Sequence, residues 1–329
     1  MSNPDVSVVV CSYNRADSLR GALESLTSLQ TDGFTYEVIV VDNASTDHTA
    51  DVIHQAIESA ATCPVRYVSE KRPGVSFARN CGVQSANGEW IYFFDDDELA
   101  EPDLLIQYLK VLRANGLKYA GGAIKIRFVS DDMETEVAAR DLKPWVRVMF
   151  SSTDGKTGEF YDRKETPGAG NLMVHRDAFD EIGLFRTDLV EGGEDTDFFH
   201  RMRAAGYEAC HVPKAIVHHR VPEFRIEPKY MKMASLRMGS HVARREYGEF
   251  SRIVFPFRIV GRSLQTYLVH GVRLLMALMG GDRESILERQ CKWWLGKGYL
   301  AAAIKFLFRG QQASSTLSFR NERKPASSA

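Results

Sequence analysis

The chain has 329 residues, of which 44% are hydrophobic and 26% charged, and a formal net charge of −1. A chain of this size and composition can bury a full core, so it is an ordinary globular protein of one or two domains. Its five cysteines are odd in number and lack a CxxC pair, which argues against a zinc site or a redox dithiol. Because no basic segment followed by a long apolar run opens the sequence, we expect reduced thiols and a cytoplasmic location.

The charge is distributed unevenly along the chain. Residues 1–250 carry 29 Lys and Arg against 39 Asp and Glu, whereas residues 251–329 carry 13 against 4. This asymmetry predicts a carboxyl-terminal region that meets an anionic surface, either nucleic acid or membrane. A basic face in contact with solvent is the alternative.

Four apolar runs rich in β-branched residues alternate with helical patterns in the first hundred residues. This order predicts a parallel sheet with right-handed crossovers, in which ligands bind beyond the carboxyl ends of the strands. Polar and charged residues follow each run, so they should meet at one edge of the sheet. The expected strands cover residues 6–11, 36–41, 65–68 and 90–94.

An acidic triplet, Asp95, Asp96 and Asp97, follows the fourth expected strand. Neighbouring carboxylates repel one another, so such a triplet is stable mainly when a cation or hydrogen-bond donors face it. A turn in solvent is the other interpretation, because aspartate also favours turns.

Taken together, these segments resemble the inverting family 2 glycosyltransferases with the GT-A fold. The matching segments are residues 8–15, 40–47, 72–80, 93–97 and the pair Glu194-Asp195, in the family's order. The resemblance implies an α/β fold with a Rossmann-like, mostly parallel sheet sandwiched by helices.

The resemblance also implies roles for individual residues on the donor side. Asp42 would read uracil or another nucleotide base, and Arg72, Arg79 and Asn80 would line the nucleotide-sugar pocket. The remaining residues expected to bind the donor are Ser12, Asn14, Arg15, Asn43, Asp95 and Asp96.

A divalent metal is the expected cofactor. Asp95 and Asp97 would form the DxD pair, with Asp97 as the direct ligand of Mg²⁺ or Mn²⁺. Carboxylates are hard oxygen ligands for these ions, and a metal held between protein and diphosphate needs only one or two of them. His218 is the expected histidine ligand, although the sequence leaves the choice between His218 and His219 open, and a purely structural histidine is the alternative.

The acceptor hydroxyl needs a general base. Residues 191–197 supply carboxylates at an expected helix start, and the resemblance favours Asp195 as the base. Glu194 and Asp197 would support it or lie on the metal side, and Gly192-Gly193 would let the loop approach the substrate. Acids that only stabilise the helix dipole are the alternative.

Two segments were expected on the acceptor side. Residues 131–167 lack a clean period, as a binding loop or lid often does. Residues 168–171 look like the family's acceptor-side segment that leads into a strand, with a simple glycine turn as the alternative.

Basic and apolar residues alternate in two stretches after residue 250. Neither contains the 18 or so uninterrupted apolar residues of a spanning helix, so we expect interfacial helices that meet anionic lipid through Arg258, Arg262 and Arg273. A helical subdomain packed on protein is the alternative. The expected domains are a catalytic domain at 1–230, a basic helical region at 231–310 and a disordered tail at 311–329.

The sequence thus predicts a metal-dependent, inverting transferase of hexosyl type, peripheral at the inner face of the cell membrane. It would move a sugar from a nucleotide-sugar donor, UDP-linked by expectation, to a lipid-linked glycan during surface polysaccharide synthesis, with no nucleic-acid partner. Two other classes stay open: a nucleotidyltransferase acting on sugar phosphates, which should show a glycine- and lysine-rich phosphate loop, and a catalytically silent binding module.

Overall fold

The protein is described from a computed structural model, which covers residues 3–130, 133–138, 141–142, 144–153, 156, 160–161, 165–189, 192–280 and 283–309. The expected disordered tail at 311–329 lies outside these residues. Two compact units divide the chain, Met1–Glu223 and Phe224–Ala329. Each unit is described by itself.

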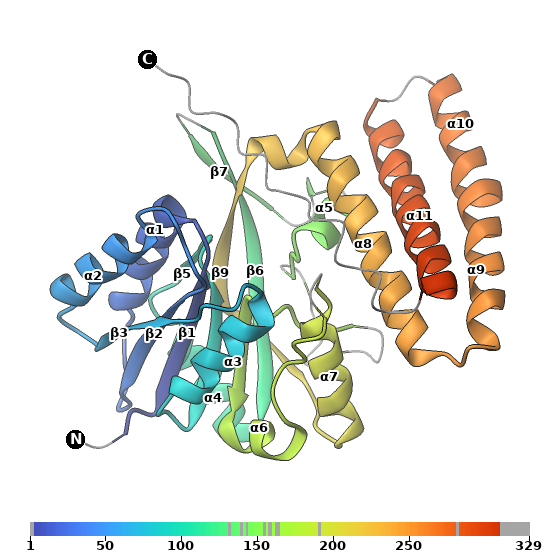
Figure 1. The fold of residues 1–329 in the computed structure, drawn as a ribbon. Helices are drawn as coiled ribbons and strands as arrows, with labels where there is room; N and C mark the ends of the chain where they lie inside the picture. Colours follow the sequence, from blue (N-terminus) through green and yellow to red (C-terminus); the bar gives the residue numbers. More distant parts are fainter. Residues whose placement is uncertain are drawn as a thin grey trace. The chain divides into compact units, whose positions relative to one another are not determined.

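The first unit begins with four parallel strands in the order β3-β2-β1-β4 (Figure 1). Their ends lie level, since Ser12 pairs with Asp42, and Cys11 pairs with Asp95. The helices of the crossovers are α1 (Ala16–Thr27), α2 (Thr49–Ser59) and α3 (Val75–Ser85). The strands are β1 (Val6–Ser12), β2 (Tyr36–Asp42), β3 (Val65–Ser69) and β4 (Trp90–Asp95).

The second part of the sheet mixes directions. β8 is antiparallel to both β4 and β6, β9 is parallel to β6 and antiparallel to β5, and β7 pairs with the outer end of β6. Over the described residues the order is therefore β3-β2-β1-β4-β8-β6-β9-β5. The bounds are β5 (Glu98–Ala100), β6 (Tyr119–Val129), β7 (Glu134–Val137), β8 (Asn171–His175) and β9 (Cys210–Pro222).

Helices cover both faces of this sheet, as the alternation of side chains in the strands requires. Val8 and Val10 of β1 face one cluster with α1, α2 and α4 (Leu104–Asn115). Val9 faces the other cluster with α3, α6 (Arg176–Ile182) and α7 (Glu194–Ala204). The expected α/β sandwich is thereby confirmed.

The second unit is helical, and its helices are packed closely. A Cβ atom added to Gly298 would lie 2.1 Å from the carbonyl oxygen of Leu236, and one added to Gly239 would lie 2.0 Å from that of Leu295. Glycine is therefore needed where two of the helices cross. The elements are η2 (Glu223–Ile226), which joins the units, α8 (Pro228–Glu249), α9 (Val254–Leu264), the π-helical segment η3 (Gln265–Gly271), α10 (Val272–Gly280) and α11 (Arg283–Arg309).

Two of the arginines expected to meet lipid form ion pairs within this unit. Arg258 and Arg262 bind the buried carboxylate of Glu246 at 2.8 and 2.7 Å, and Tyr299 donates a third hydrogen bond to it at 2.7 Å. Both arginines thus balance the buried carboxylate on α8, while their side chains stay 43% and 34% exposed, so contact of these two arginines with lipid stays a prediction. Arg273 stays exposed. In the described part of the chain, no helix has the length and apolar character needed to cross a membrane.

Candidate active site

The polar residues expected at the strand ends do meet at the carboxyl edge of the parallel strands. Asp95 ends β4, and Asp96 and Asp97 form the tight turn that leads into β5. A two-residue turn points successive side chains in different directions. Each of the three aspartates consequently has its own surroundings.

Asp96 is turned toward β1 and is 4% exposed. Ser12 donates a hydrogen bond to its Oδ2 atom at 2.7 Å, and Arg15 contacts its Oδ1 atom at 2.8 Å. Burial raises the pKa of Asp96 to about 6, although the positive charge of Arg15 opposes the shift. Asp96 therefore holds the segment after β1 against the strand end and turn formed by Asp95, Asp96 and Asp97, which we call the acidic turn.

Asp97 faces a different set of partners. Arg15 bridges Asp96 and Asp97, with its NH1 atom 2.8 Å from Asp97 Oδ2. The same Oδ2 atom lies 3.7 Å from Nε2 of His219, a buried nitrogen that has no hydrogen-bond partner. A carboxylate oxygen beside an imidazole nitrogen without a partner is a donor set that fits a divalent ion such as Mn²⁺ or Mg²⁺.

These side chains do not form a complete metal cage. Among the residues that the structure describes, no group of three or more His, Cys, Asp and Glu side chains is arranged to hold a metal ion. A metal at Asp97 and His219 would need further ligands from water or from a bound substrate. That requirement agrees with a site in which a diphosphate completes the coordination.

The histidine beside Asp97 is His219 and not His218. Neighbouring residues of a strand face opposite sides, and β9 pairs with β5 so that His219 lies opposite Glu98. His218 faces the other side, where its Nε2 atom lies 2.6 Å from Glu101 and its Nδ1 atom 3.0 Å from Glu136. The structure thus separates His218 from the acidic turn to which it was assigned.

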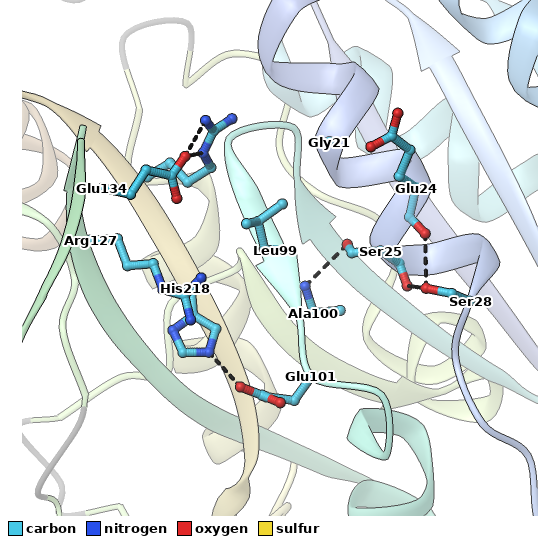
Figure 2. Close-up of a pocket in the computed structure, with 11 residues that line it drawn as sticks. Gly21, Glu24, Ser25, Ser28, Leu99, Ala100, Glu101, Arg127, Glu134 and His218 are labelled. Carbon is cyan, nitrogen blue, oxygen red and sulfur yellow. Dashed lines mark hydrogen bonds and ion pairs between the residues drawn. The ribbon is translucent and has the colours of Figure 1, made fainter. Parts of the chain in front are cut away.

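Figure 2 shows the surroundings of His218, a cavity of about 480 Å³ between α1, β5 and β9. The cavity is lined by small and charged side chains, with Glu101 pointing at the imidazole. It lies on the side of β9 away from Asp97. Its further lining residues are Gly21, Glu24, Ser25, Ser28, Leu99, Ala100, Arg127, Glu134 and Arg220.

Arg79 connects the acidic turn to the start of α7. Its NH1 atom lies 2.5 Å from Glu194 Oε1, and its NH2 atom lies 3.8 Å from Asp95 Oδ1. Arg79 and Glu194 are 8% and 6% exposed. A buried ion pair is stable only when both charges are kept together, so Arg79 fixes the distance between two segments that lie far apart in sequence.

Glu98 is a fourth acid at this edge. It is 2% exposed, its Oε2 atom has no hydrogen-bond partner, and burial together with the charges of Asp95 and Asp97 raises its pKa well above the ordinary value. The backbone at Gly170 approaches closely, since a Cβ atom there would lie 2.7 Å from Asp95 and 2.9 Å from Glu98. The expected segment before β8 therefore does reach the acidic turn.

The expected base, Asp195, lies in the first turn of α7 beside Glu194. Its Oδ1 atom accepts a hydrogen bond from its neighbour Thr196 at 2.6 Å. Gly192 and Gly193 precede it with φ angles of 109° and 92°, which only glycine adopts readily. The expected unusual backbone at the double glycine is therefore present, whereas the approach of this loop to a substrate stays a prediction.

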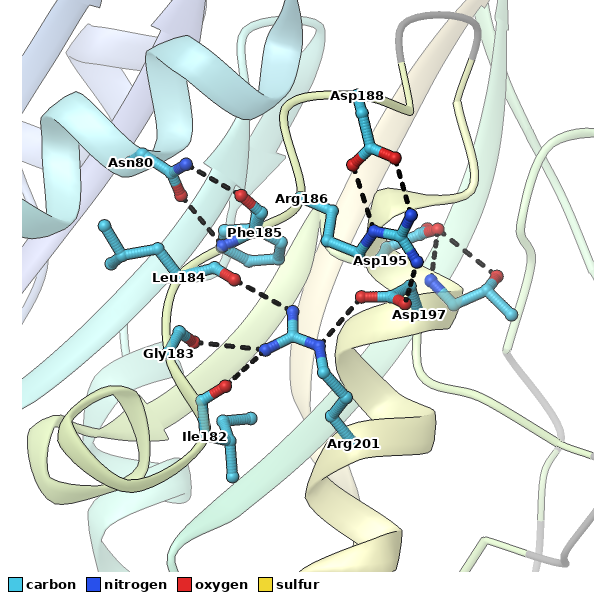
Figure 3. A network of polar contacts seen from close by, with 11 residues as sticks. Asn80, Ile182, Gly183, Leu184, Phe185, Arg186, Asp188, Asp195, Asp197 and Arg201 are labelled. Atoms are coloured by element: carbon cyan, nitrogen blue, oxygen red, sulfur yellow. Dashed lines mark hydrogen bonds and ion pairs between the residues drawn. The ribbon is translucent and has the colours of Figure 1, made fainter. Parts of the chain in front are cut away.

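Asp197 has a structural role that its position in the acidic segment concealed. Arg201 binds it at 2.8 Å one turn further along α7, and Arg186 lies 3.6 Å from its other oxygen (Figure 3). Arg201 also donates to the carbonyl oxygens of Ile182 and Leu184. Asp197 therefore orients an arginine that fastens the loop before α7.

Several residues expected to line the donor pocket hold its loops in place. Asn80 exchanges two hydrogen bonds with the backbone of Phe185, at 2.8 and 2.9 Å (Figure 3). The side-chain amide of Asn43 donates to the carbonyl oxygens of Glu70 and Arg72, and its oxygen accepts from Gly74. The bonding capacity of both asparagines is largely used within the chain, so direct binding of a ligand by them stays a prediction.

The loops after β1 and β2 are joined in the same way. Asn14, at φ 53°, accepts hydrogen bonds from the backbone of Thr46 and Asp47. Asp42 is 5% exposed and accepts from Ser45 and Tyr67. These hydrogen bonds fix the loops after β1 and β2 at the carboxyl edge of the sheet.

Arg72 is different, since its side chain is 65% exposed. It binds Glu70 at 2.6 Å and lies over the ring of Phe77. Among these loop residues expected to bind the donor, Arg72 therefore has the side chain that is most accessible to a ligand.

The described residues of the segment at 131–167 include regular structure. They contain β7, which pairs with β6, and the short helix α5 (Pro144–Met149). Phe150 follows this helix, packs edge-on against His219 and offers its carbonyl oxygen 3.3 Å from the Nδ1 atom. This contact orients the imidazole toward Asp97.

The family of the chain follows from comparison with known proteins. The model of Glycosyl transferase family 2 matches residues 7–183, which is more than half of the chain. The chain belongs to this family and is a glycosyltransferase.

Two curated relatives show how far the similarity extends. The succinoglycan biosynthesis protein ExoM of Rhizobium meliloti is 28% identical over 245 residues, which are 71% of this chain and 72% of ExoM. The dolichyl N-acetyl-alpha-D-glucosaminyl phosphate 3-beta-D-2,3-diacetamido-2,3-dideoxy-beta-D-glucuronosyltransferase of Methanococcus voltae is 26% identical over 59% of this chain and 57% of its own length. The chain therefore spans less than two thirds of the second relative.

A solved structure confirms the fold. The mannosyltransferase PcManGT of Pyrobaculum calidifontis, in complex with GDP-Man and Mn²⁺, superposes with a TM-score of 0.61 at 19% identity. The match covers 94% of this chain and 88% of PcManGT. The α/β fold of the chain is thus the GT-A fold.

Proposed function

We propose that the protein is an inverting, metal-dependent glycosyltransferase that moves a hexose-type sugar from a nucleotide-sugar donor to an acceptor hydroxyl. The observation that carries this proposal is the buried Arg79, which links Asp95 of the acidic turn to Glu194 beside Asp195. Groups suited to a diphosphate leaving group and to a hydroxyl nucleophile are thereby held at one edge of the sheet. A metal-binding or nucleotide-binding role alone would not require the second group.

On the donor side, Asp97 and His219 would hold the metal, with Asp95 facing the phosphates. When bound, the metal supplies Lewis-acid stabilisation of the charge that develops on the departing diphosphate. Arg15 lies 2.8 Å from Asp97 and would add positive charge for a bound diphosphate. Asp42 would contact the nucleotide base, and Arg72 would contact the nucleotide from the exposed edge of the site.

On the acceptor side, Asp195 would take the proton from the attacking hydroxyl. Its Oδ1 atom is held by the amide of Thr196 at 2.6 Å, which fixes the orientation of the carboxylate. Glu194 is tied to Arg79 and acts as a positioning residue. A general base placed in this way contributes about 10²–10⁴-fold to turnover.

The acceptor and the place of the reaction are inferred from two further observations. Relatives of the chain carry the names of polysaccharide biosynthesis proteins and of a dolichyl phosphate transferase. The second unit exposes many large apolar side chains. We infer a lipid-linked glycan acceptor of a surface polysaccharide and a peripheral position at the inner face of the cell membrane.

A panel of sugar nucleotides tests the function. Purified full-length protein is incubated with UDP-linked and GDP-linked hexoses, with Mn²⁺ or Mg²⁺ or with a chelator, and release of the nucleoside diphosphate is measured. We expect one donor, UDP-linked by inference, to be turned over only with the metal.

The same panel separates the rival functions. A nucleotidyltransferase would form a sugar nucleotide from a sugar phosphate and a nucleoside triphosphate and release pyrophosphate. A silent binding module would bind a sugar nucleotide without turnover. Either result would remove the proposed transfer.

A further inference from the structure

The outer face of the helix formed by α9, η3 and α10 is apolar over its whole length. Large apolar side chains recur on it at helical spacing and are exposed to between 40% and 77%. They include Ile253, Phe257, Val260, Leu264, Tyr267, Leu268, Val272, Leu275, Met276 and Met279. We call this set the outer stripe.

Packing among the described residues does not explain the apolar composition of this helix. Phe255 is the buried residue of α9, Thr266 is the buried residue of η3, and α10 has none. Water-soluble proteins rarely expose contiguous apolar patches of more than a few hundred square ångströms. The outer stripe is therefore expected to be covered when the protein works.

The inner side of the same helix is closely packed. A Cβ atom added to Gly296 of α11 would lie 2.2 Å from the hydroxyl oxygen of Thr266. Phe255 belongs to a core with Ala243, Tyr299 and Phe306. The outer stripe is thus the outside of a well-packed unit and not a core that failed to close.

The charge around the stripe points to an anionic partner. Between residues 250 and 281 the sequence has no Asp or Glu and has arginine at 252, 258, 262 and 273. Arg258 and Arg262 are engaged by Glu246, whereas Arg252 and Arg273 are exposed near opposite ends of the helix. An apolar stripe with cations and no anions matches the boundary between acyl chains and anionic headgroups.

We propose that the outer stripe is a membrane-binding surface that lies in the plane of an anionic lipid monolayer. The apolar side chains would enter the acyl boundary, and Arg252 and Arg273 would contact lipid phosphates. The inference rests on the proposed function for its setting and adds the surface that would bind the membrane, but that surface does not depend on glycosyl transfer. A second copy of the chain is the competing occupant.

Co-sedimentation with vesicles tests the proposal on the full-length protein. Vesicles of phosphatidylcholine are compared with vesicles that contain one third phosphatidylglycerol. The test variant is the triple change Phe257→Ser, Leu264→Ser and Leu275→Ser. The control changes three exposed apolar residues of the catalytic unit, Ile57→Ser, Met133→Ser and Phe160→Ser.

We expect the wild type and the control to bind anionic vesicles. The test variant should bind at least about tenfold more weakly, because it lacks three large apolar side chains that the membrane would bury. Arg252→Glu with Arg273→Glu should weaken binding to anionic vesicles and leave binding to neutral vesicles unchanged. High salt should reproduce that charge effect.

Three outcomes would overturn the proposal: no binding of the wild type to either vesicle, equal binding of the test variant, or a wild-type dimer that the test variant converts to a monomer without any vesicle binding. Release of nucleoside diphosphate from the donor, measured without vesicles, separates this proposal from the proposed function. The test variant should retain that reaction. Vesicle binding by a wild type that shows no turnover would contradict the proposed function and still support the proposed membrane-binding surface.

Discussion

The two units depart from the usual distribution of side chains in opposite ways. The first unit, Met1–Glu223, buries charge, since Asp96, Asp97, Glu98, Arg79 and Glu194 are each less than 9% exposed. The helical unit exposes apolar side chains, with Phe257 at 74% and Met279 at 74%. Both arrangements cost stability in an isolated chain in water. We infer from this comparison that the two units bind partners of different kinds: a charged small molecule at the first, and an apolar surface at the second.

The largest expected effect comes from removing the carboxylate that we propose binds the metal in the first unit. Asp97→Asn should lower transfer by several powers of ten, because a neutral amide loses both charge and ligand strength. Turnover and metal titration of the variant measure this effect. Asp177→Asn, at an exposed acid that binds Lys118, is the control, and wild-type turnover with an unchanged metal titration in Asp97→Asn would exclude the role.

The proposed general base, Asp195, is tested independently of donor binding. Asp195→Asn should lower turnover by roughly 10²–10⁴ and leave donor affinity within a few-fold, since the residue acts on the acceptor hydroxyl. Steady-state kinetics and donor titration supply the two numbers. A collapse of donor affinity with turnover preserved at saturation would make Asp195 a binding residue.

The two neighbouring histidines provide a matched pair. His219→Ala should weaken metal binding by at least about tenfold, because its Nε2 atom faces Asp97. His218→Ala should leave metal binding unchanged, because its partners are Glu101 and Glu136. Equal effects of the two changes in a Mn²⁺ titration would contradict the assignment.

The smallest expected effect concerns the buried charge of the helical unit. Burial alone would raise the pKa of Glu246, but hydrogen bonds from Arg258, Arg262 and Tyr299 lower it to about 2. A carboxyl group with a lowered pKa stabilises the fold fully above its unfolded pKa of about 4.5 and loses that contribution as the pH falls through about 2. Glu246→Gln should therefore cost about 1–3 kcal/mol at neutral pH, and the difference from wild type should shrink in acid.

Urea unfolding of the full-length chain at several pH values measures this difference. Tryptophan fluorescence is a suitable signal, because Trp293 and Trp294 lie on α11. Glu58→Gln on the exposed side of α2 is the control. A constant difference between pH 7 and pH 2.5 would show that the charge of Glu246 is not what stabilises the unit.

The part of the site that the sequence predicted is the part built from local patterns. Each apolar run of the parallel half ends in polar residues, so the edge with Ser12, Asp42 and Asp95 follows from strand order alone. The choice between His218 and His219 depends instead on the register of β9 against β5. That register is set by contacts between residues far apart in the chain, and β9 also carries an irregularity opposite Gly122 and Ala123.

The same reasoning explains the other differences. The sequence indicated Arg79 and Glu194 separately, but their pairing joins positions 115 residues apart. In the helical unit, the basic residues are visible in the sequence, but the ion pairing of Arg258 and Arg262 depends on the buried Glu246 of α8. A count of charges cannot distinguish a cation that faces a membrane from one that balances an interior carboxylate.

The central claim is that donor and metal bind together at the carboxyl edge, with Asp97 as the shared contact. Electron paramagnetic resonance of Mn²⁺ tests it directly, because the free ion gives a signal that disappears on binding. We predict that the wild-type protein depletes free Mn²⁺ far more in the presence of its sugar nucleotide than without it, and that Asp97→Asn does not. An unchanged free Mn²⁺ signal at saturating donor, or equal depletion by wild type and Asp97→Asn, would contradict the account.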